Sequence, residues 1–338
     1  MTEGKRVTLL PFEPLNQAPK DFILVSHDSL RDFVFSAGCR VGLPAEKAGL
    51  LADLLVDNDL RGVVSHGTTQ IATYAILMRD GRLNPKPDVR VVKETPVSLI
   101  FDGDGGLGYF PSYEGTRRVI EKAKQSGIAV MLSRNHGHFG AAGIYARMTL
   151  GHDLLCYVTS GHQLLLKPGQ PLYDAAGGSP MAFTAPTADE APVVLDFGAM
   201  HDLYGPPRDE LAALAPGLVL RSIGLGEICQ AWGGLLSGLR IEPEPPRWTW
   251  PGANQGSLVI CLRIDLFAEP DVFKGEMDAY VRRVRELQPL PGFDQSLMPG
   301  GIEAECAGPY RADGIPVGPE HRRRLDGLAK ELGLQAPW

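Results

Sequence analysis

From residue 26 to about residue 80, apolar residues recur at helical spacing. The spacing from Leu30 is three residues to Phe33 and four to Val34, which predicts a helix. Ser26 or Ser29 can cap this helix. The same kind of spacing predicts a second helix from about 44 to 59 and a third over 71–79. Residues 1–25 contain several prolines and no such pattern, so we expect an irregular N-terminal arm.

Beyond residue 80, short runs of β-branched residues alternate with longer helical stretches. Strands are expected at 89–92, 97–101, 128–132, 154–158, 181–184, 193–195 and 258–264. Helices are expected at 112–126, 141–150, 223–239 and 271–287. Several prolines within 201–218 favour a loop there. The mixture of elements predicts an α/β protein.

The net charge restricts the class of partner. The chain has 338 residues and a formal net charge of −7. General nucleic-acid binding needs clustered Lys and Arg to neutralise phosphates, so we expect no nucleic-acid partner. The one basic run, at 321–324, fits the polar face of a C-terminal helix.

The chain also lacks the usual signals of membranes and oxidising compartments. No apolar run approaches the roughly 20 residues that span a bilayer, and no secretory signal follows the N-terminus. The five cysteines are scattered and form no C-x-x-C pair. We therefore expect no membrane association, disulfide framework or structural zinc site, and a cytoplasmic location.

One glycine-rich segment, at 103–108, satisfies the G-x-G-x-x-G pattern of dinucleotide-binding Rossmann folds. Two details oppose that interpretation. Residues 109–111 separate the last glycine from the expected helix, and the next strand ends without an acidic residue that could hold a ribose. A six-residue pattern is weak evidence in a chain with 40 glycines, so we expect a plain turn.

Two histidine-containing segments carry the strongest chemical signal. Residues 135–143 place His136 and His138 among small residues, and His66 lies upstream within Ser-His-Gly at 65–67. The pKa of imidazole lies close to neutral pH, which suits proton transfer. The segments together predict an active site with histidine acid/base groups. No grouping has a persuasive metal spacing, although His136 and His138 could give two ligands to a site completed elsewhere.

These segments resemble motifs of the second malate/L-lactate dehydrogenase family. That family also includes ureidoglycolate, sulfolactate and diketogulonate dehydrogenases and piperideine-carboxylate reductase. The resemblance covers most of the chain from about residue 26. Four segments carry it: 59–67 (D-L-R-G-x-x-S-H-G), 81–85 (G-x-[IL]-N-P), 134–143 (R-N-S-x-H-F-G-A-A-G) and 192–196, the strand before the nucleotide loop.

The resemblance implies an α/β fold that is not a Rossmann fold, with a helical N-terminal region and a mixed-sheet domain of the cofactor-binding type. The implied division is an arm at 1–25, a discontinuous substrate and dimerisation domain at 26–125 plus 285–338, and a cofactor-binding-type domain at 126–284. The implied activity is hydride transfer between NAD or NADP and a small 2-oxo or 2-hydroxy acid or a cyclic imino acid. A homodimer is implied as well.

The resemblance also implies the residues of the site. His66 and His138 are the expected acid and base, since an imidazolium beside a carbonyl can give its proton as hydride arrives. The residues expected on the substrate side are Arg61, Ser65, Tyr74, His136 and Thr159. Those expected to hold the cofactor are Gly177, Gly178, Ser179, Asp196, Arg221, Ser222, Gly301 and Glu303.

Several of these assignments have a purely structural alternative. Arg61 could clamp a carboxylate with two hydrogen bonds, or form a surface ion pair with Asp59. Tyr74 could be a core residue. His136 has no counterpart in the family pattern and is either a substrate contact peculiar to this chain or a structural residue. His152 and His162 are expected at the surface or in loops.

The chain departs from the family pattern where the cofactor is expected. Residues 177–180 read G-G-S-P in place of G-T-N-P, and 196–200 read D-F-G-A-M in place of D-M-A-T-S. Arg221 and Ser222 replace a Lys-Gly pair, and Gln70 replaces an arginine. Three functions stay open: a dehydrogenase that holds its cofactor differently, a cofactor-independent lyase, cyclase or isomerase that uses the two histidines, and a catalytically silent scaffold.

Overall fold

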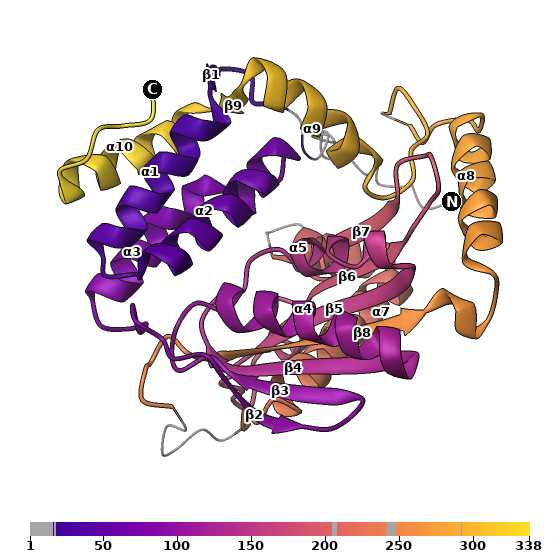
Figure 1. Ribbon diagram of the computed structural model, residues 1–338, viewed down its shortest axis with the longest axis horizontal. Coiled ribbons are helices and arrows are strands. Elements are labelled where there is room, and N and C mark those ends of the chain that lie inside the picture. The colour runs from indigo at the N-terminus through magenta and orange to yellow at the C-terminus, as the bar shows by residue number, and fades with distance from the viewer. Residues whose placement is uncertain (1–15, 17, 205–207, 242–247, 292) are drawn as a thin grey trace, which may run out of the picture.

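A helical layer packs beside a seven-stranded sheet in the computed structural model, which describes residues 16, 18–204, 208–241, 248–291 and 293–338 (Figure 1). The helical layer consists of α1 (His27–Arg40), α2 (Ala45–Leu60), α3 (Ile71–Arg79) and α10 (Pro319–Leu332). The hydroxyl of Ser26 caps α1, and Leu30 and Val34 are fully buried, as the sequence predicts. The basic run at 321–324 lies on α10, which confirms the predicted C-terminal helix.

The segment before α1 is more regular than its composition suggests. The strand β1 (Ile23–Val25) pairs antiparallel with β9 (Ile315–Val317). The expectation of an irregular arm is therefore wrong for these three residues, because their partner strand lies almost 300 residues further along the chain. Most of the rest of the expected arm, 1–15 and 17, lies outside the described residues.

The sheet contains seven strands in the order β2-β3-β4-β8-β5-β6-β7. Their bounds are β2 (Arg90–Glu94), β3 (Ser98–Asp102), β4 (Ile128–His136), β5 (Leu154–His162), β6 (Pro180–Ala185), β7 (Val193–Gly198) and β8 (Gln255–Arg263). Only β3 and β4 pair in parallel, and the other neighbours are antiparallel. This order confirms an α/β fold that is not a Rossmann fold, which needs a mostly parallel sheet.

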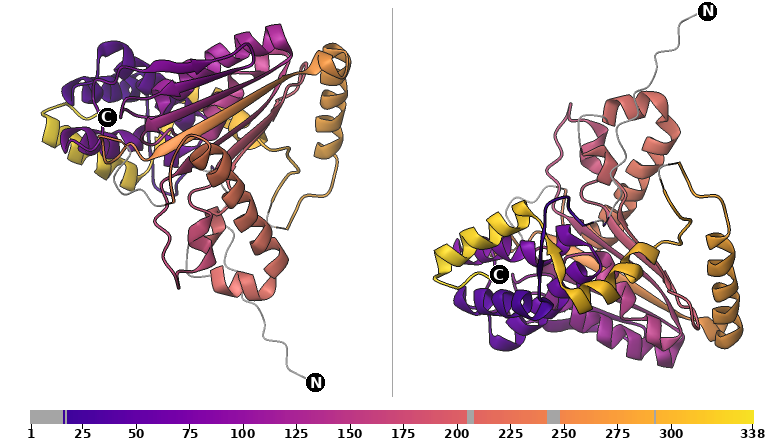
Figure 2. Two further views of the ribbon diagram at one scale, coloured as in Figure 1. Left: turned by 90° about the horizontal axis from the view of Figure 1, so that it is seen from below. Right: turned by 90° about the horizontal axis from the view of Figure 1, so that it is seen from above.

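Helices cover both faces of the sheet. The helices α4 (Tyr109–Ser126) and α5 (Ala142–Arg147) lie on one face, and α6 (Arg208–Leu214) and α7 (Pro216–Cys229) project from the other (Figure 2). The helices α8 (Pro270–Arg285) and α9 (Gly301–Asp313) return the chain to the helical layer. No helix of the described residues is long and apolar enough to cross a membrane.

The loop expected at 201–218 is wrong in its second half. Both α6 and the start of α7 lie within that stretch. Pro216 occupies the first turn of α7, where its missing N–H costs no helical hydrogen bond. Pro216, which favoured a loop in the sequence, therefore begins a helix.

The glycine-rich segment at 103–108 is filled by the protein itself. The helix α4 starts at Tyr109, directly after Gly108, so the expected separation of glycine and helix is wrong. A Cβ atom on Gly105 would lie 2.1 Å from the Trp250 indole, and one on Gly106 would lie 2.5 Å from the Pro87 ring. These glycines therefore admit neighbouring side chains, and the turn is structural, as we expected.

The sheet also crosses the boundary that we expected at 125/126. The strands β2 and β3 precede that position, β4 follows it, and β3 pairs with β4 along its length. The division of the chain into domains remains a prediction.

A short π-helical stretch, η6 (Gln230–Leu235), continues α7 and packs against the end of β5. A Cβ atom on Gly233 would lie 2.5 Å from the backbone of Ser160 and Gly161, and one on Gly234 would lie within 3.5 Å of Gly161. Glycine thus lets the two backbones meet. This contact fixes the segment of β5 that faces the cavity described below.

We expect Gly233→Ala to lower the free energy of unfolding by about 2 kcal/mol, because the added methyl group overpacks two backbones that cannot easily separate. Gly224→Ala is the matched control, since it lies in α7 with no atom within 4 Å of an added Cβ. Its helix propensity should instead add roughly 0.5–1 kcal/mol. Urea unfolding of both variants measures the difference, and equal stabilities would contradict the close contact.

Candidate active site

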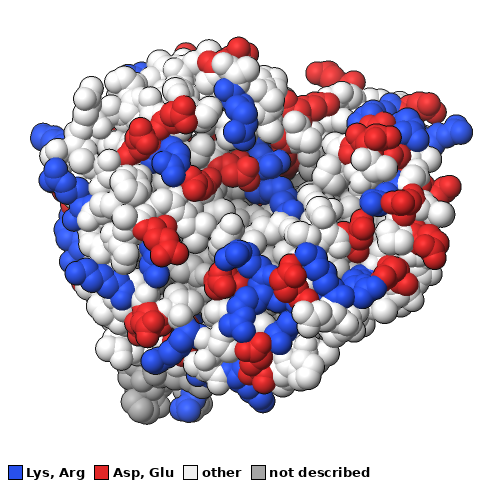
Figure 3. Space-filling model, in the orientation of Figure 1, with Lys and Arg blue, Asp and Glu red and all other residues white. Residues whose placement is uncertain are grey.

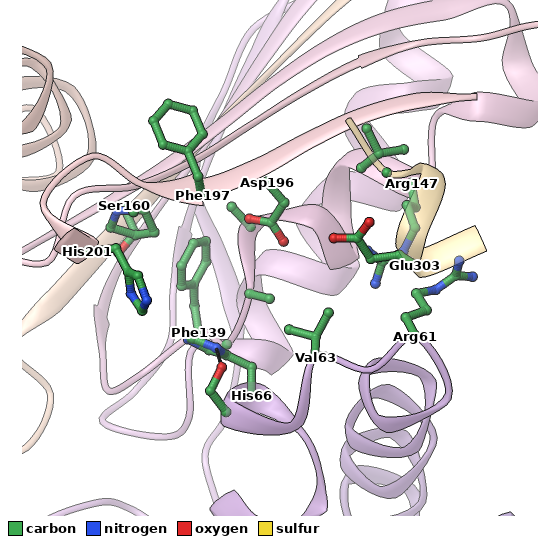
Figure 4. Close-up of a pocket in the computed structure, with 18 of the residues that line it drawn as sticks. Arg61, Val63, His66, Phe139, Arg147, Ser160, Asp196, Phe197, His201 and Glu303 are labelled. Carbon is green, nitrogen blue, oxygen red and sulfur yellow. Dashed lines mark hydrogen bonds between the residues drawn. The ribbon is translucent and has the colours of Figure 1, made fainter. Parts of the chain in front are cut away.

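A cavity of about 730 Å³ lies between the helical layer and the sheet. Charged side chains of both signs are interspersed over the face of the molecule seen in Figure 3. The close-up in Figure 4 shows His66, Phe139, Asp196 and Glu303 around the cavity. The predicted site residues that line it are Arg61, Ser65, His66, His138, Gly178, Asp196 and Glu303.

The two expected catalytic histidines come together in this cavity. The centroids of the His66 and His138 rings lie 5.5 Å apart. His66 ends a short 3₁₀ turn (Val64–His66), and His138 follows β4. Their proximity joins two segments separated by about 70 residues, as the motifs suggest.

Each of the two rings has a hydroxyl partner. The Tyr74 hydroxyl lies 2.7 Å from Nδ1 of His138, and it also lies 3.1 Å from the Tyr109 hydroxyl. The Ser65 Oγ lies 3.0 Å from Nδ1 of His66. Tyr74 itself is buried and does not line the cavity, so its contact with the site is through His138.

The surroundings favour the neutral form of both rings. Burial, together with smaller contributions from the neighbouring rings of His66 and His136, lowers the pKa of His138 to about 3. Burial also lowers the pKa of His66, with a smaller contribution from His201. Both histidines are therefore neutral near pH 7 in the free protein and can accept a proton.

The end of α2 positions the turn that carries His66. The Asn58 side chain donates to the His66 carbonyl at 2.9 Å. The Asp59 carboxylate accepts from the Thr68 backbone N–H at 2.9 Å and from its hydroxyl. A Cβ atom on Gly67 would lie 1.7 Å from the Asp59 carboxylate, so only glycine lets the turn approach so closely. Burial raises the pKa of Asp59 to about 7.

Arg61 forms its ion pair with a different residue from the one expected. Its guanidinium donates twice to Asp57, at 3.0 and 3.2 Å, whereas Asp59 faces Thr68. The structural alternative that we kept open, an ion pair with Asp59, is wrong because Asp57 lies one helical turn before Arg61, on the same face. Arg147, which sequence reasoning missed, also donates to Asp57 at 3.2 Å.

His136 is structural rather than a substrate contact. Its Nε2 lies 2.7 Å from the Ser133 hydroxyl, and its Nδ1 lies 2.7 Å from the Gly137 carbonyl. The Ser133 hydroxyl continues to Ser257 at 2.6 Å. The ring is fully buried and does not line the cavity, so the suggested substrate contact is wrong. Among the described residues, no group of three or more His, Cys, Asp or Glu could hold a metal ion.

Other predicted residues lie beside the cavity or away from it. Thr159 is buried, and its hydroxyl donates to the Pro180 carbonyl at 2.9 Å. Arg221 and Ser222 lie on α7 and do not line the cavity, and Arg221 is exposed. The remaining predicted cofactor residues are sequence neighbours of residues that line it: Gly177, Ser179 and Gly301.

Two further histidines line the cavity, and the sequence did not predict them as site residues. His162 ends β5 and lines the cavity, so its expected surface position is wrong; burial lowers its pKa. His201 also lines the cavity (Figure 4). His152 is exposed, as expected. Neither His162 nor His201 belongs to a motif, and no sequence signal distinguished them from surface histidines.

Comparison with known proteins agrees with this architecture. The family described as malate/L-lactate dehydrogenase matches residues 25–200 and 209–326. Malate dehydrogenase of Pyrococcus horikoshii is 36% identical over 94% of this chain and 97% of its own length. Its solved structure superimposes with a TM-score of 0.80 and 25% identity, over 95% of this chain and 98% of that one.

Relatives with other names match over similar lengths. L-sulfolactate dehydrogenase of Methanocaldococcus jannaschii is 28% identical over 87% of this chain and 93% of its own. Ureidoglycolate dehydrogenase (NAD(+)) of Escherichia coli K12 is 26% identical over 82% and 87%. The chain belongs to the malate/L-lactate dehydrogenase family, and is thus an oxidoreductase of a dehydrogenase family.

Loss of the Tyr74 hydroxyl should be costly. Tyr74→Phe leaves Nδ1 of His138 and the buried Tyr109 hydroxyl each without a hydrogen bond, so we expect a loss of about 2 kcal/mol in the free energy of unfolding. Tyr280→Phe, on the exposed surface of α8, is the control and should leave stability unchanged. Indistinguishable unfolding of the two variants would contradict the importance of this contact.

Proposed function

We propose that the protein is an NAD- or NADP-dependent dehydrogenase or reductase of small 2-oxo or 2-hydroxy acids or cyclic imino acids, with His66 and His138 as acid/base groups. The observation that supports this most directly is the pair of partly buried histidine rings, 5.5 Å apart, at the wall of one cavity. Membership of the dehydrogenase family supports the reaction type.

The cavity wall fits the nicotinamide end of such a cofactor. Phe139 and Phe197 provide apolar surface, and Gly178, Gly198 and Gly300 present backbone without side chains. A Cβ atom on Gly178 would have no atom closer than 3.9 Å, so that stretch of backbone is open to a ligand. When bound, the cofactor would supply or accept the hydride. Since Arg221 and Ser222 lie outside the cavity lining, backbone groups carry more of the binding than we expected.

The two histidines would have different tasks. The hydrogen bond between the Tyr74 hydroxyl and Nδ1 fixes the His138 ring, so the nitrogen that remains for a ligand is Nε2. A ring that is fixed in this way suits a group that orients the substrate. His66 lies on a turn, and among the described residues the hydrogen-bond partner of its ring is the exposed Ser65 hydroxyl, which suits proton transfer. During reduction its imidazolium gives a proton to the forming alkoxide, and during oxidation its neutral ring takes that proton back.

A homodimer remains part of the proposal. Residues 216–236 comprise α7, the π-helical stretch and the residue that follows it. This segment exposes several large apolar side chains: Leu218, Leu220, Leu225, Ile228, Trp232, Leu235 and Leu236. Large exposed apolar side chains in one segment are typical of a surface that contacts another protein. This surface supports self-association through 216–236, rather than through the substrate and dimerisation domain that we expected at 26–125 plus 285–338. We also propose a cytoplasmic location, because the five cysteines are scattered and form no C-x-x-C pair.

Cofactor titration is the decisive experiment. We expect 1 mM NAD(H) or NADP(H) to raise the melting temperature, because a ligand that binds only the native state stabilises it by mass action. His66→Gln and His138→Gln should each lower activity about 100-fold or more and keep this shift. His152→Gln, on the exposed surface, is the control and should retain activity.

The absence of a shift with all four nicotinamides would contradict the proposal. Product formed without any nicotinamide, and lost in both histidine variants, would point to the cofactor-independent lyase, cyclase or isomerase. Function that is indifferent to both substitutions would point to the silent scaffold.

The pH dependence should follow the lowered pKa of His66. Oxidation of a hydroxy acid needs the neutral ring, and the lowered pKa keeps the ring neutral into the acid range. We therefore expect kcat/KM for oxidation to persist below pH 6.5, the ordinary histidine value, and to fall only at lower pH. Asp196 is the other cavity group that titrates nearby, at a pKa of about 6, and Asp196→Asn removes its contribution; the acid limb that remains in this variant should still lie below pH 6.5. An acid limb above pH 7 would contradict the assignment.

A further inference from the structure

One end of the cavity carries charges of both signs. Figure 4 shows Arg61, Arg147, Glu303 and Asp196 grouped there, beyond Val63 from His66. Both arginines share the carboxylate of Asp57. The helices α2 and α9, the helix α5 and the strand β7 all contribute, so segments from the whole chain converge on this cluster.

The charges in this cluster do not balance. Two guanidinium groups face three carboxylates: those of Asp57, Asp196 and Glu303. Asp57 takes three guanidinium hydrogen bonds, so much of the positive charge is already compensated. With every group ionised, the end of the cavity therefore has one negative charge in excess.

The two carboxylates that line the cavity have unused acceptor capacity. Asp196 accepts from the Gly143 backbone N–H at 2.9 Å, and Glu303 accepts from the Asn16 amide at 2.8 Å. Within the described residues, the second oxygen of each carboxylate has no hydrogen-bond partner. Burial, with a smaller contribution from the charge of Glu303, raises the pKa of Asp196 to about 6, and the Gly143 N–H and Arg147 oppose the shift. The negative charges of Asp196 and Glu303 therefore repel each other.

No compensating cation comes from position 70. Gln70 stands there, and its amide donates to the Ser65 carbonyl at 2.6 Å. It neither brings a charge nor lines the cavity. Acids with two negative groups would therefore place the second one near two carboxylates in a poorly solvated space, where like charges repel strongly.

We propose that this end of the cavity selects acids that carry a nitrogen N–H group, such as a protonated amine or imine or a ureido group, over acids that carry a second anionic group. Asp196 and Glu303, which the family resemblance assigns to the cofactor, here accept the N–H donors of the substrate, and Arg61 and Arg147 attract the substrate carboxylate. This inference rests on the proposed function, since it specifies the substrate class of the same cavity. It concerns binding and includes no new chemical step.

Steady-state kinetics with three reducible acids tests the proposal: Δ1-piperideine-2-carboxylate, pyruvate and oxaloacetate, each with saturating cofactor. We expect kcat/KM to be at least tenfold higher for the cyclic imino acid than for the dianionic oxaloacetate. In the double variant Asp196→Asn/Glu303→Gln, this ratio should fall at least tenfold, mainly through a lower KM for oxaloacetate. Glu305→Gln is the matched control, because Glu305 lies on the same helix but is exposed and does not line the cavity.

Direct binding separates this inference from the proposed function. L-Pipecolate should raise the melting temperature of the wild type more than L-malate does, and the order should reverse or vanish in the double variant. Circular dichroism and the melting temperature without ligand show whether that variant is folded. The single Glu303→Gln variant, whose amide oxygen can still accept from Asn16, gives a second and milder test.

A preference of the wild type for the dianion, an unchanged ratio in the folded variants, or the absence of any shift with L-pipecolate would overturn the inference. A double variant with a changed ratio of NAD⁺ to NADH affinity but an unchanged substrate preference would also overturn the inference. The carboxylates would then face the nicotinamide ring. The nicotinamide titration is judged separately: a cofactor shift without the substrate preference contradicts only the inference.

Discussion

The last turn of α2 carries three consecutive polar residues, Asp57, Asn58 and Asp59, and each one fixes a different part of the cavity. Successive side chains on a helix point about 100° apart, so the three diverge. Asp57 holds the two arginines, Asn58 holds the carbonyl of His66, and Asp59 holds the backbone and hydroxyl of Thr68. Asn58 and Asp59 are fully buried, so their hydrogen bonds form in a medium of low polarity, where a lost partner is costly.

Burial also explains the state of the histidines. Among the residues that the structure describes, no carboxylate favours the charged ring of His66 or His138, and each of the two lies near another imidazole. Desolvation then favours the neutral form. The only carboxylates that line the cavity, among the described residues, stand at its charged end, where they face arginines and each other. The cavity thereby has one region with neutral imidazole rings and another with charged side chains.

Much of the fold was predictable because its signals are local. Periodicity correctly placed the helices of the N-terminal layer and the strands of the sheet, and the motifs brought His66 and His138 into one site. The errors came from interactions that are distant in sequence. The strand β1 depends on β9 near the other end of the chain. Arg147 and His162 enter the cavity through the packing of α5 and β5, and nothing in their own neighbourhood marks them.

The sequence by itself determined the class of fold, the family and the identity of the two central histidines, since these depend on local spacing and on motifs of contiguous residues. Only the tertiary structure decided which polar residues share the cavity. It placed His136 in a buried hydroxyl network, paired Arg61 with Asp57 and set Arg147 beside them. The physical reason is that hydrogen bonding, burial and charge balance depend on neighbours in space, and those neighbours come from segments that the chain brings together only when it folds.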